Sequence, residues 1–363
     1  MNKIKVGVLG ATGMVGQNYI QLLENHPWFE VTYLAASPQS AGKKYSDAVA
    51  GRWQMRKPVP THLKNVIVED ASNIDAAIGK VSFMFSAMDL ETKDKTKELE
   101  FAYAKKGIPI VSNSSANRWT PDVPMLIPEI NFDHLKVIEA QKKNHDCKGF
   151  VAVKPNCSLQ SYITPIYALE KAGYKIEKMI ITTLQAVSGA GYPGVPSLDM
   201  IDNIVPLIGG EDEKTEKEPS KILGHVENGK IVSNESIKIS ATCTRVPVVD
   251  GHTAIVSLKF VDSANKPSIE EIKKIWANFK SVPQELNLPF APVEPIHYTE
   301  EENRPQPRKD RDADKGMAIT IGRLRPCNVF DYKFVGLSHN TVRGAAGGGI
   351  LNAELLHAKG YFK

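Results

Sequence analysis

The sequence lacks the features of disulfide-bonded, membrane-spanning or nucleic-acid-binding proteins. Only four of its 363 residues are cysteine, and their spacing is not that of metal ligands, so we expect neither a disulfide framework nor a metal site. Lys+Arg 45 against Asp+Glu 41 leaves a net charge of +4, too small to indicate a nucleic-acid or membrane partner. No apolar run reaches the roughly 18–20 residues that span a bilayer. Because the first residues already form a strand-like pattern, we expect no targeting peptide and a cytoplasmic protein.

What the sequence does contain is the alternation of strand-like and helix-like segments that is typical of an α/β protein. Its 363 residues, 42% hydrophobic and 24% charged, favour two globular domains. In the first half, apolar runs alternate with stretches of helical spacing such as Met14–Glu24. The expected strands are residues 5–9, 31–36, 66–68, 81–86 and 108–112. Strands buried on both faces and separated by crossover helices predict a doubly wound parallel sheet of the Rossmann type.

The pattern changes near Cys157. We expect a helix over 159–172, then β-rich segments over 179–186, 237–249 and 253–260, with a hairpin turn at Asp250-Gly251. Residues 285–315 are rich in proline and charge and predict a long loop. These features predict a second α+β domain with a mixed, mostly antiparallel sheet.

A last helix, over 343–358, is expected to pack on the first domain, because the glycines at its start suit close approach to another element. The cofactor domain would then be discontinuous. It would comprise residues 1–156 with 341–363, and the catalytic and oligomerisation domain would comprise residues 157–340.

A glycine-rich turn follows the first expected strand and reads Gly10-Ala11-Thr12-Gly13-Met14-Val15-Gly16. Small residues between a strand and a helix let the backbone approach a pyrophosphate, whose charge then lies on amides at the helix N-terminus. The spacing differs from the G-x-G-x-x-G of many NAD enzymes, and an ordinary glycine turn is the alternative.

The end of the second strand predicts which nicotinamide cofactor binds. NAD sites usually carry Asp or Glu there, to bind the ribose hydroxyls. Here Ala36 is followed by Ser37, Ser40, Lys43 and Lys44, without a carboxylate. Hydroxyls and lysines can bind a 2′-phosphate, so NADP is the expected cofactor; a solvated loop with incidental lysines is the alternative.

The candidate nucleophile is Cys157, which directly precedes the expected helix, where a helix dipole would stabilise its thiolate. Arg245 and His252 stand seven residues apart across a turn, and Pro247 with Asp250-Gly251 can bend that segment so that both point into one cleft. A thiol, a histidine and a nicotinamide cofactor together indicate aldehyde oxidation through a thioester, with His252 as general acid and base.

With these residues and motifs, the chain resembles the aspartate-β-semialdehyde dehydrogenases, in the branch found in fungi and archaea. The likeness spans essentially the whole chain. It implies reversible NADPH-dependent conversion of L-4-aspartyl phosphate to L-aspartate 4-semialdehyde and phosphate, a step toward lysine, threonine, methionine and isoleucine. The motifs that carry the resemblance are residues 10–16, 112–115, 155–158, 188–191, 209–214 and 245–252.

The resemblance also implies roles for individual residues. Cys157 would be the acyl-thioester nucleophile and His252 the acid/base. Substrate binding would fall to Arg245 at the α-carboxylate, Glu211 at the ammonium, Arg118, Lys214 and Asn156 around phosphate, and Gln185 near the thiol. The NADP site would be lined by Gly10, Thr12, Gly13, Met14, Val15, Ser37, Ser40, Ser86, Ser188, Gly189 and Asn340. Family members form dimers or tetramers, so a homodimer or homotetramer is expected.

The residue types suit aspartyl phosphate independently, since it carries two anionic groups and one ammonium. Against this, residues 211–218 could be a solvated, charged helix face. Three alternatives stay open: an N-acetyl-glutamyl-phosphate reductase, whose substrate has no ammonium for Glu211; a glyceraldehyde-3-phosphate dehydrogenase; and a sensor that binds NADP without turnover.

Overall fold

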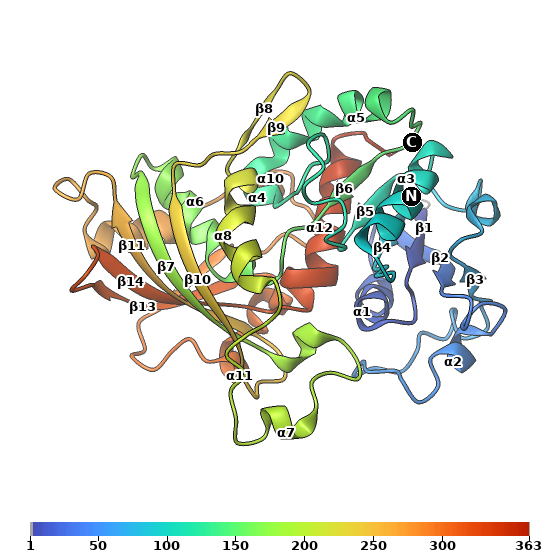
Figure 1. Cartoon of the computed structure of the whole chain (residues 1–363), viewed down its shortest axis with the longest axis horizontal. Helices are drawn as coiled ribbons and strands as arrows, with labels where there is room; N and C mark the ends of the chain where they lie inside the picture. The colour runs from blue at the N-terminus through green and yellow to red at the C-terminus, as the bar shows by residue number, and fades with distance from the viewer. Residues whose placement is uncertain (1–2, 363) are drawn as a thin grey trace.

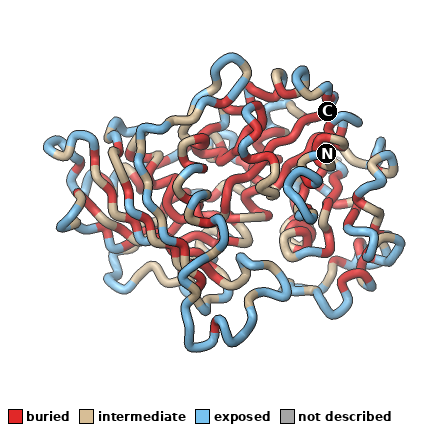
Figure 2. Tube along the Cα trace, in the orientation of Figure 1, coloured by how far each residue is buried: buried red, intermediate tan, exposed pale blue. Residues whose placement is uncertain are grey.

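Two six-stranded sheets form the framework of the molecule and lie along its long axis (Figure 1). The computed structural model describes residues 3–362. Buried residues concentrate along the strands and in the layer of helices between the two sheets (Figure 2). Among the described residues, none of the helices combines the length and the apolar character that a bilayer crossing requires.

The first sheet is parallel, with strand order β3-β2-β1-β4-β5-β6. Its four central strands are almost wholly apolar and buried, as expected for strands covered on both faces. This confirms the predicted Rossmann-type sheet, whose order reverses between β1 and β4 and leaves a crevice for ligands at their carboxyl ends. The strands are β1 (Ile4–Leu9), β2 (Phe29–Ala36), β3 (Glu69–Asp70), β4 (Phe83–Ser86), β5 (Ile110–Ser112) and β6 (Val151–Val153).

Helices cover this sheet, and the last helix of the chain is one of them. α12 (Gly347–Ala358) packs against α1 (Met14–Leu23) and β5, and Ile350 and Leu351 enter the same apolar cluster as Val6. The exact division of the chain into two domains stays a prediction. The other helices of this half are α2 (Tyr45–Ala48), α3 (Lys93–Lys105), α4 (Pro128–Asn131) and α5 (Ile138–Asn144), with 3₁₀ turns at Ile74–Ala77 and Phe132–Val137.

The second sheet is mixed and mostly antiparallel, as predicted, with order β10-β7-β11-β14-β13-β12. Its strands are β7 (Ile176–Gln185), β10 (Lys238–Arg245), β11 (His252–Phe260), β12 (Ile296–Thr299), β13 (Ile319–Pro326) and β14 (Tyr332–Ser338). The helices of this half are α6 (Ile163–Lys171), α7 (Ser197–Met200), α8 (Glu211–Ile222), α9 (Ile269–Ala277), α10 (Val282–Glu285) and α11 (Pro307–Asp310), and β8 (His225–Glu227) pairs with β9 (Lys230–Val232).

The predicted hairpin at Asp250-Gly251 is wrong, because β7 lies between β10 and β11. Residues 246–251 cross the end of β7, where the Val246 amide donates to Gln185 O at 3.0 Å and the Val187 amide donates to Val248 O at 2.8 Å. Six residues are enough to span the roughly 10 Å between alternate strands. The consequence is functional, since the ends of three strands meet at this edge.

Three other expectations need correction. The helix predicted over 159–172 is broken: a 3₁₀ turn covers Ser158–Ser161, and α6 begins only at Ile163, which leaves Pro165 in its first turn, where a missing amide costs least. Residues 285–315 contain β12 and α11 rather than a continuous loop. In 66–68 only Ile67 forms a bridge, to Lys44, and the paired strand follows it.

Candidate active site

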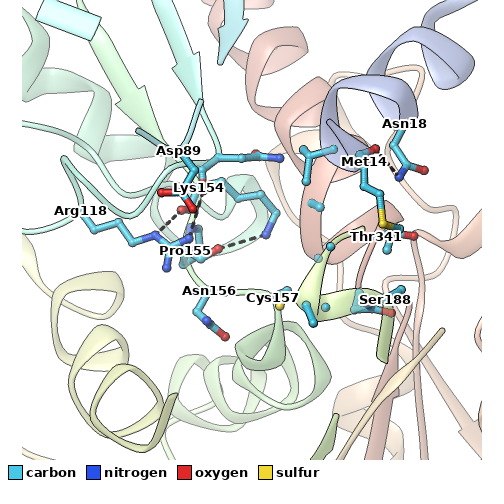
Figure 3. Close-up of a pocket in the computed structure, with 18 residues that line it drawn as sticks. Met14, Asn18, Asp89, Arg118, Lys154, Pro155, Asn156, Cys157, Ser188 and Thr341 are labelled. Atoms are coloured by element: carbon cyan, nitrogen blue, oxygen red, sulfur yellow. Dashed lines mark hydrogen bonds between the residues drawn. The ribbon is translucent and has the colours of Figure 1, made fainter. Parts of the chain in front are cut away.

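A cavity of about 310 Å³ lies where the carboxyl ends of the first sheet face the second sheet (Figure 3). Of the predicted site residues, its wall contains Met14, Val15, Arg118, Asn156, Cys157, Ser188, Gly189 and Asn340. A neighbouring opening shares Val15, Arg118, Asn156 and Gly189 and adds Lys214. The geometry therefore gathers residues from both halves of the chain around one thiol.

The glycine turn after β1 fits an anionic cofactor. A Cβ at Gly10, where φ is +75°, would lie 2.6 Å from Ala87 O, and one at Gly16 would lie 2.2 Å from Gly10 O, so only glycine fits at either position. At Gly13 the nearest atom to such a Cβ is 3.6 Å away. In the part of the chain that the structure describes, no side chain caps α1, which leaves its first amides available to a pyrophosphate at the wall of the cavity.

The end of β2 is more acidic than its own sequence indicates. Ser37 is exposed, while Ser40 is buried and its amide donates to Ser37 O at 2.9 Å; both lie outside the wall of the cavity. Strand β3 places Asp70 in register with Ala36. Sequence reasoning missed this carboxylate, because it comes from the neighbouring strand rather than from the residues after Ala36.

Ser86 is placed away from the cavity. Its hydroxyl is fully buried and donates to a carboxylate oxygen of Glu100 at 2.8 Å, and Asn117 donates to the other oxygen at 2.7 Å. Burial raises the pKa of Glu100, although these hydrogen bonds oppose the rise. The structure therefore gives the Ser86 side chain a partner in the interior, where it ties β4 to α3.

Cys157 precedes a 3₁₀ turn of only four residues, so little helix dipole acts on its sulfur. Burial and the Glu211 carboxylate raise the pKa of the thiol to about 11, against the lowering effect of Lys154, Arg118 and Arg245. The expected stabilisation of the thiolate by a helix dipole is therefore small, and the nearby cations only oppose a net rise of the thiol pKa.

His252 begins β11 and is completely buried. Its Nδ1 accepts a hydrogen bond from the Ala186 amide at 3.0 Å, so the neutral ring carries its proton on Nε2, which has no partner among the described residues. Burial, Arg245 and His339 lower the pKa of His252 to about 3. The ring is thus held as a neutral Nε2–H donor.

Arg245 lies beside this ring, as the bent connection predicts. A Cβ at Gly189 would fall 2.7 Å from Arg245 Nη1 and 3.1 Å from His252 Cε1, which places the cavity wall directly over both side chains. Arg245 Nη1 also donates to Ala186 O at 2.8 Å. Asn340 holds the same wall, since its Nδ2 donates to Ser188 Oγ at 2.8 Å.

Glu211 is the centre of a polar cluster behind Asn156. Its carboxylate accepts hydrogen bonds from Asn156 Nδ2 at 2.9 Å, Gln185 Nε2 at 3.2 Å and Lys214 Nζ at 2.7 Å. Burial alone would raise the pKa of Glu211, but Lys214 and the two amides hold it below its usual range. The carboxylate is therefore charged, and one cation already neutralises it.

Arg118 is held by the protein on three sides. It donates to Glu218 Oε1 at 2.9 Å, Lys154 O at 3.0 Å and Asn113 O at 3.2 Å, and two of its five N–H groups have no partner within residues 3–362. Glu218 also accepts from the Asn156 amide at 2.6 Å. Sequence reasoning missed Glu218, although its spacing from Glu211 and Thr215 marks one buried face of α8.

Comparison with known proteins agrees with this geometry. Residues 5–138 match the semialdehyde dehydrogenase, NAD binding domain, and residues 166–343 match the semialdehyde dehydrogenase, dimerisation domain. Similar proteins include the aspartate-semialdehyde dehydrogenases of Methanothermobacter thermautotrophicus, 45% identical over 98% of this chain and 99% of the relative, and of Aspergillus fumigatus, 43% identical over 99% and 98%.

A solved structure extends the likeness to three dimensions. The crystal structure of aspartate semialdehyde dehydrogenase with NADP from Candida albicans is 38% identical, covers 99% of this chain and all of its own, and superposes with a TM-score of 0.88. The three comparisons, by sequence, by family domain and by structure, all indicate the same family. This protein belongs to the aspartate-semialdehyde dehydrogenase family.

Proposed function

We propose that the chain catalyses the reversible, NADPH-dependent reduction of L-4-aspartyl phosphate to L-aspartate 4-semialdehyde, with release of phosphate. The observation that carries the proposal is the position of Cys157, between an uncapped helix N-terminus suited to a dinucleotide and a wall of buried cations and carboxylates. We place the reaction in the synthesis of lysine, threonine, methionine and isoleucine.

The covalent chemistry falls to Cys157. Its thiolate adds to the acyl carbon, the bond from that carbon to the phosphate oxygen breaks, and phosphate leaves with the electron pair, which gives a thioester. NADPH, when bound along the turn of residues 10–16, supplies the hydride that reduces this acyl group. Cleavage of the carbon–sulfur bond then releases the aldehyde and returns the thiolate.

His252 acts in this account through its Nε2–H. Because Nδ1 is occupied by the Ala186 amide, the ring donates to the oxygen that gains negative charge when sulfur adds to the carbonyl. Giving up that proton would leave an imidazolate, so the neutral ring stabilises the oxygen by hydrogen bonding and keeps its proton. In this proposal the acid/base role expected of His252 is therefore narrowed to donation of a hydrogen bond.

Each charged group of the substrate meets a group of opposite charge in the proposed site. Arg245 offers a planar guanidinium to the α-carboxylate, and the Glu211 carboxylate accepts the α-ammonium. Arg118, Lys214 and Asn156 surround the phosphate, and Gln185 orients the substrate through its contact with Glu211. Each of these roles is part of the proposal.

We further propose a cytoplasmic homodimer or homotetramer. Support comes from the match of residues 166–343 to a dimerisation domain and from apolar side chains exposed around α7, where Leu198 is 85% and Leu207 67% exposed. Sedimentation of the purified protein should give a mass of two or four chains, and a monomer at micromolar concentration would contradict this.

The test of function compares acyl phosphates with NADPH as reductant. Consumption of NADPH with L-4-aspartyl phosphate, and little with N-acetyl-glutamyl phosphate, is the expected result, since an acetylated amine offers no charge to Glu211. The reverse preference would reassign the substrate. NADPH binding without turnover of either compound would favour the sensor.

A further inference from the structure

Glu218 is a buried carboxylate to which the proposed reaction gives no task. Its side chain is 1% exposed, and it lies on α8, two turns after Glu211. Its two oxygens accept hydrogen bonds from different parts of the chain, Oε1 from Arg118 Nη1 at 2.9 Å and Oε2 from the Asn156 amide at 2.6 Å. Both donors belong to residues that line the cavity (Figure 3). One carboxylate therefore holds two of the three residues that we place around the phosphate.

The spacing along α8 explains this arrangement. Glu211, Lys214 and Glu218 are separated by three and then four residues, so they share one face of the helix. That face holds Asn156 at two places, since Glu211 accepts from its side-chain Nδ2 at 2.9 Å and Glu218 accepts from its backbone amide. Because Lys214 extends from the same face, Glu218 fixes the other two phosphate residues relative to it.

The contacts of Arg118 show what Glu218 adds. In the described part of the chain, the Arg118 side chain donates to three groups, and Glu218 is the one that carries a charge. The other two are the carbonyls of Asn113 and Lys154, which belong to the first half of the chain. Lys221, on the next turn of α8, donates to Arg118 O at 2.6 Å. Helix α8 thus holds both the backbone and the guanidinium of Arg118.

A carboxylate beside a phosphate site weakens the attraction of the anion, so its benefit there lies elsewhere. A guanidinium binds phosphate best through two parallel N–H groups, and this geometry depends on the orientation of its plane. Glu218 holds that plane and also neutralises a buried charge when phosphate is absent. The carboxylate therefore exchanges some phosphate affinity for a defined orientation of the groups that bind it.

We propose that Glu218 is a positioning residue, which acts through Arg118 and Asn156 and aligns phosphate for transfer to and from the acyl group on Cys157. The inference rests on the proposed function and concerns one step of it. In that step, written from the thioester, a phosphate oxygen bonds to the acyl carbon, the carbon–sulfur bond breaks, and the thiolate leaves with the electron pair. Hydride transfer from the aldehyde adduct to NADP, which forms the thioester, needs no phosphate.

The experiment starts from L-aspartate 4-semialdehyde and NADP and measures the two steps separately. Without phosphate, a burst of NADPH reports the formation of the thioester. Phosphate is then added, and mass spectrometry follows the loss of the acyl group from Cys157. Glu218→Gln offers one acceptor oxygen to two donors, so Arg118 or Asn156 loses its partner. The burst should be retained, while loss of the acyl group at saturating phosphate should slow roughly 10- to 100-fold, the usual effect of a misplaced reacting group.

The dependence on phosphate concentration separates orientation from charge. Glu218→Gln removes a negative charge, so the phosphate concentration that gives half the maximal rate should not rise. Glu218→Asp keeps the charge but is one methylene shorter, so it cannot reach both partners. We expect a smaller slowing of the phosphate step in this variant, at an unchanged half-maximal concentration. Glu218→Asp also decides the test if Glu218→Gln does not fold.

Glu129→Gln is the matched control. Glu129 is equally buried and accepts from Arg343 Nη1 at 2.8 Å, but Arg343 has no proposed role at the substrate. Both steps should keep their rates in this variant. The control therefore separates the loss of this carboxylate from the loss of any buried Arg–Glu pair.

The proposal would be overturned by an unchanged phosphate step in folded Glu218→Gln, or in Glu218→Asp where only that variant folds. Slowing of the burst by the same factor as the phosphate step, or an equal slowing of the phosphate step in Glu129→Gln, would overturn it as well. Failure of the proposed function has a different signature, since the unmodified protein would then give no burst of NADPH from the aldehyde.

Discussion

The two sides of the cavity are built in different ways. The cofactor side is a local structure, in which seven consecutive residues, 10–16, form the turn after β1 and the first turn of α1 and offer neutral backbone amides. The catalytic side is assembled from the ends of β7 and β10, the start of β11, the face of α8 and the segment at Cys157. Local geometry defines the first side, and strand order defines the second.

The two sides also differ in electrostatics. Dipoles at a helix N-terminus bind an anion with little desolvation cost, because the amides need no counter-charge. The catalytic side instead buries charged groups, among them Arg118 with Glu218 and Glu211 with Lys214. Removing one partner there leaves an uncompensated charge, so we expect substitutions on the catalytic side to have the larger effects.

Apart from loss of the Cys157 nucleophile itself, the largest effect is expected for His252→Asn. The asparagine carbonyl can still accept from the Ala186 amide, but its short side chain cannot place an N–H where Nε2 stood. Turnover should fall by roughly 10²–10⁴-fold with a small change in KM. His297→Asn on β12 serves as the control, and an equal loss there would show that the effect is not specific to the site.

Arg245→Lys should act on binding. Lysine keeps the charge but loses the planar fork, and a hydrogen bond to a charged group contributes about 1.5–3 kcal/mol. The KM for aspartyl phosphate should therefore rise roughly 10- to 100-fold, while NADPH affinity stays unchanged. The exposed Arg325→Lys on β13 should alter neither value, and a fall in kcat without a rise in KM would contradict the carboxylate role.

The lowered pKa of His252 also predicts that the stability of the folded protein depends on pH. Its folded pKa of about 3 lies below its ordinary value of 6.5, so between these pH values the unfolded chain binds more protons. The free energy of unfolding should thus rise with pH in this window, with a contribution from His252 of up to about 1.4 kcal/mol per pH unit. Denaturant unfolding at pH 7 and at pH 5 should show that the free energy of unfolding falls less on acidification in His252→Asn than in the unmodified protein. Equal falls in the two proteins would mean that His252 is already protonated in the folded state.

The smallest effect is expected on the cofactor side. Ser37→Asp adds a negative charge near the proposed 2′-phosphate, next to the Asp70 that β3 already supplies. Two charges 4 Å apart in water interact by about 1 kcal/mol, so preference for NADPH over NADH should fall about fivefold. Ser236→Asp in the second half is the control, and an unchanged ratio in Ser37→Asp would move the 2′-phosphate away from this loop.

The same contrast explains what could be predicted from the sequence. The parallel sheet, the glycine turn and the mixed character of the second sheet follow from periodicity and short motifs. Strand order does not, so the hairpin at Asp250-Gly251 was predicted where β7 intervenes, and Asp70 was missed beside Ala36. Glu218 carried a local signal in the buried face of α8, but its partners Arg118 and Asn156 are distant in the sequence.

The most direct test of the account is single-turnover acylation, in which the enzyme is mixed with L-4-aspartyl phosphate without NADPH and the peptides are weighed by mass spectrometry. The account predicts one aspartyl adduct, on Cys157, released by later addition of NADPH, and no adduct or turnover in Cys157→Ala. An adduct on Cys147, Cys243 or Cys327 instead, or full activity in Cys157→Ala, would contradict it.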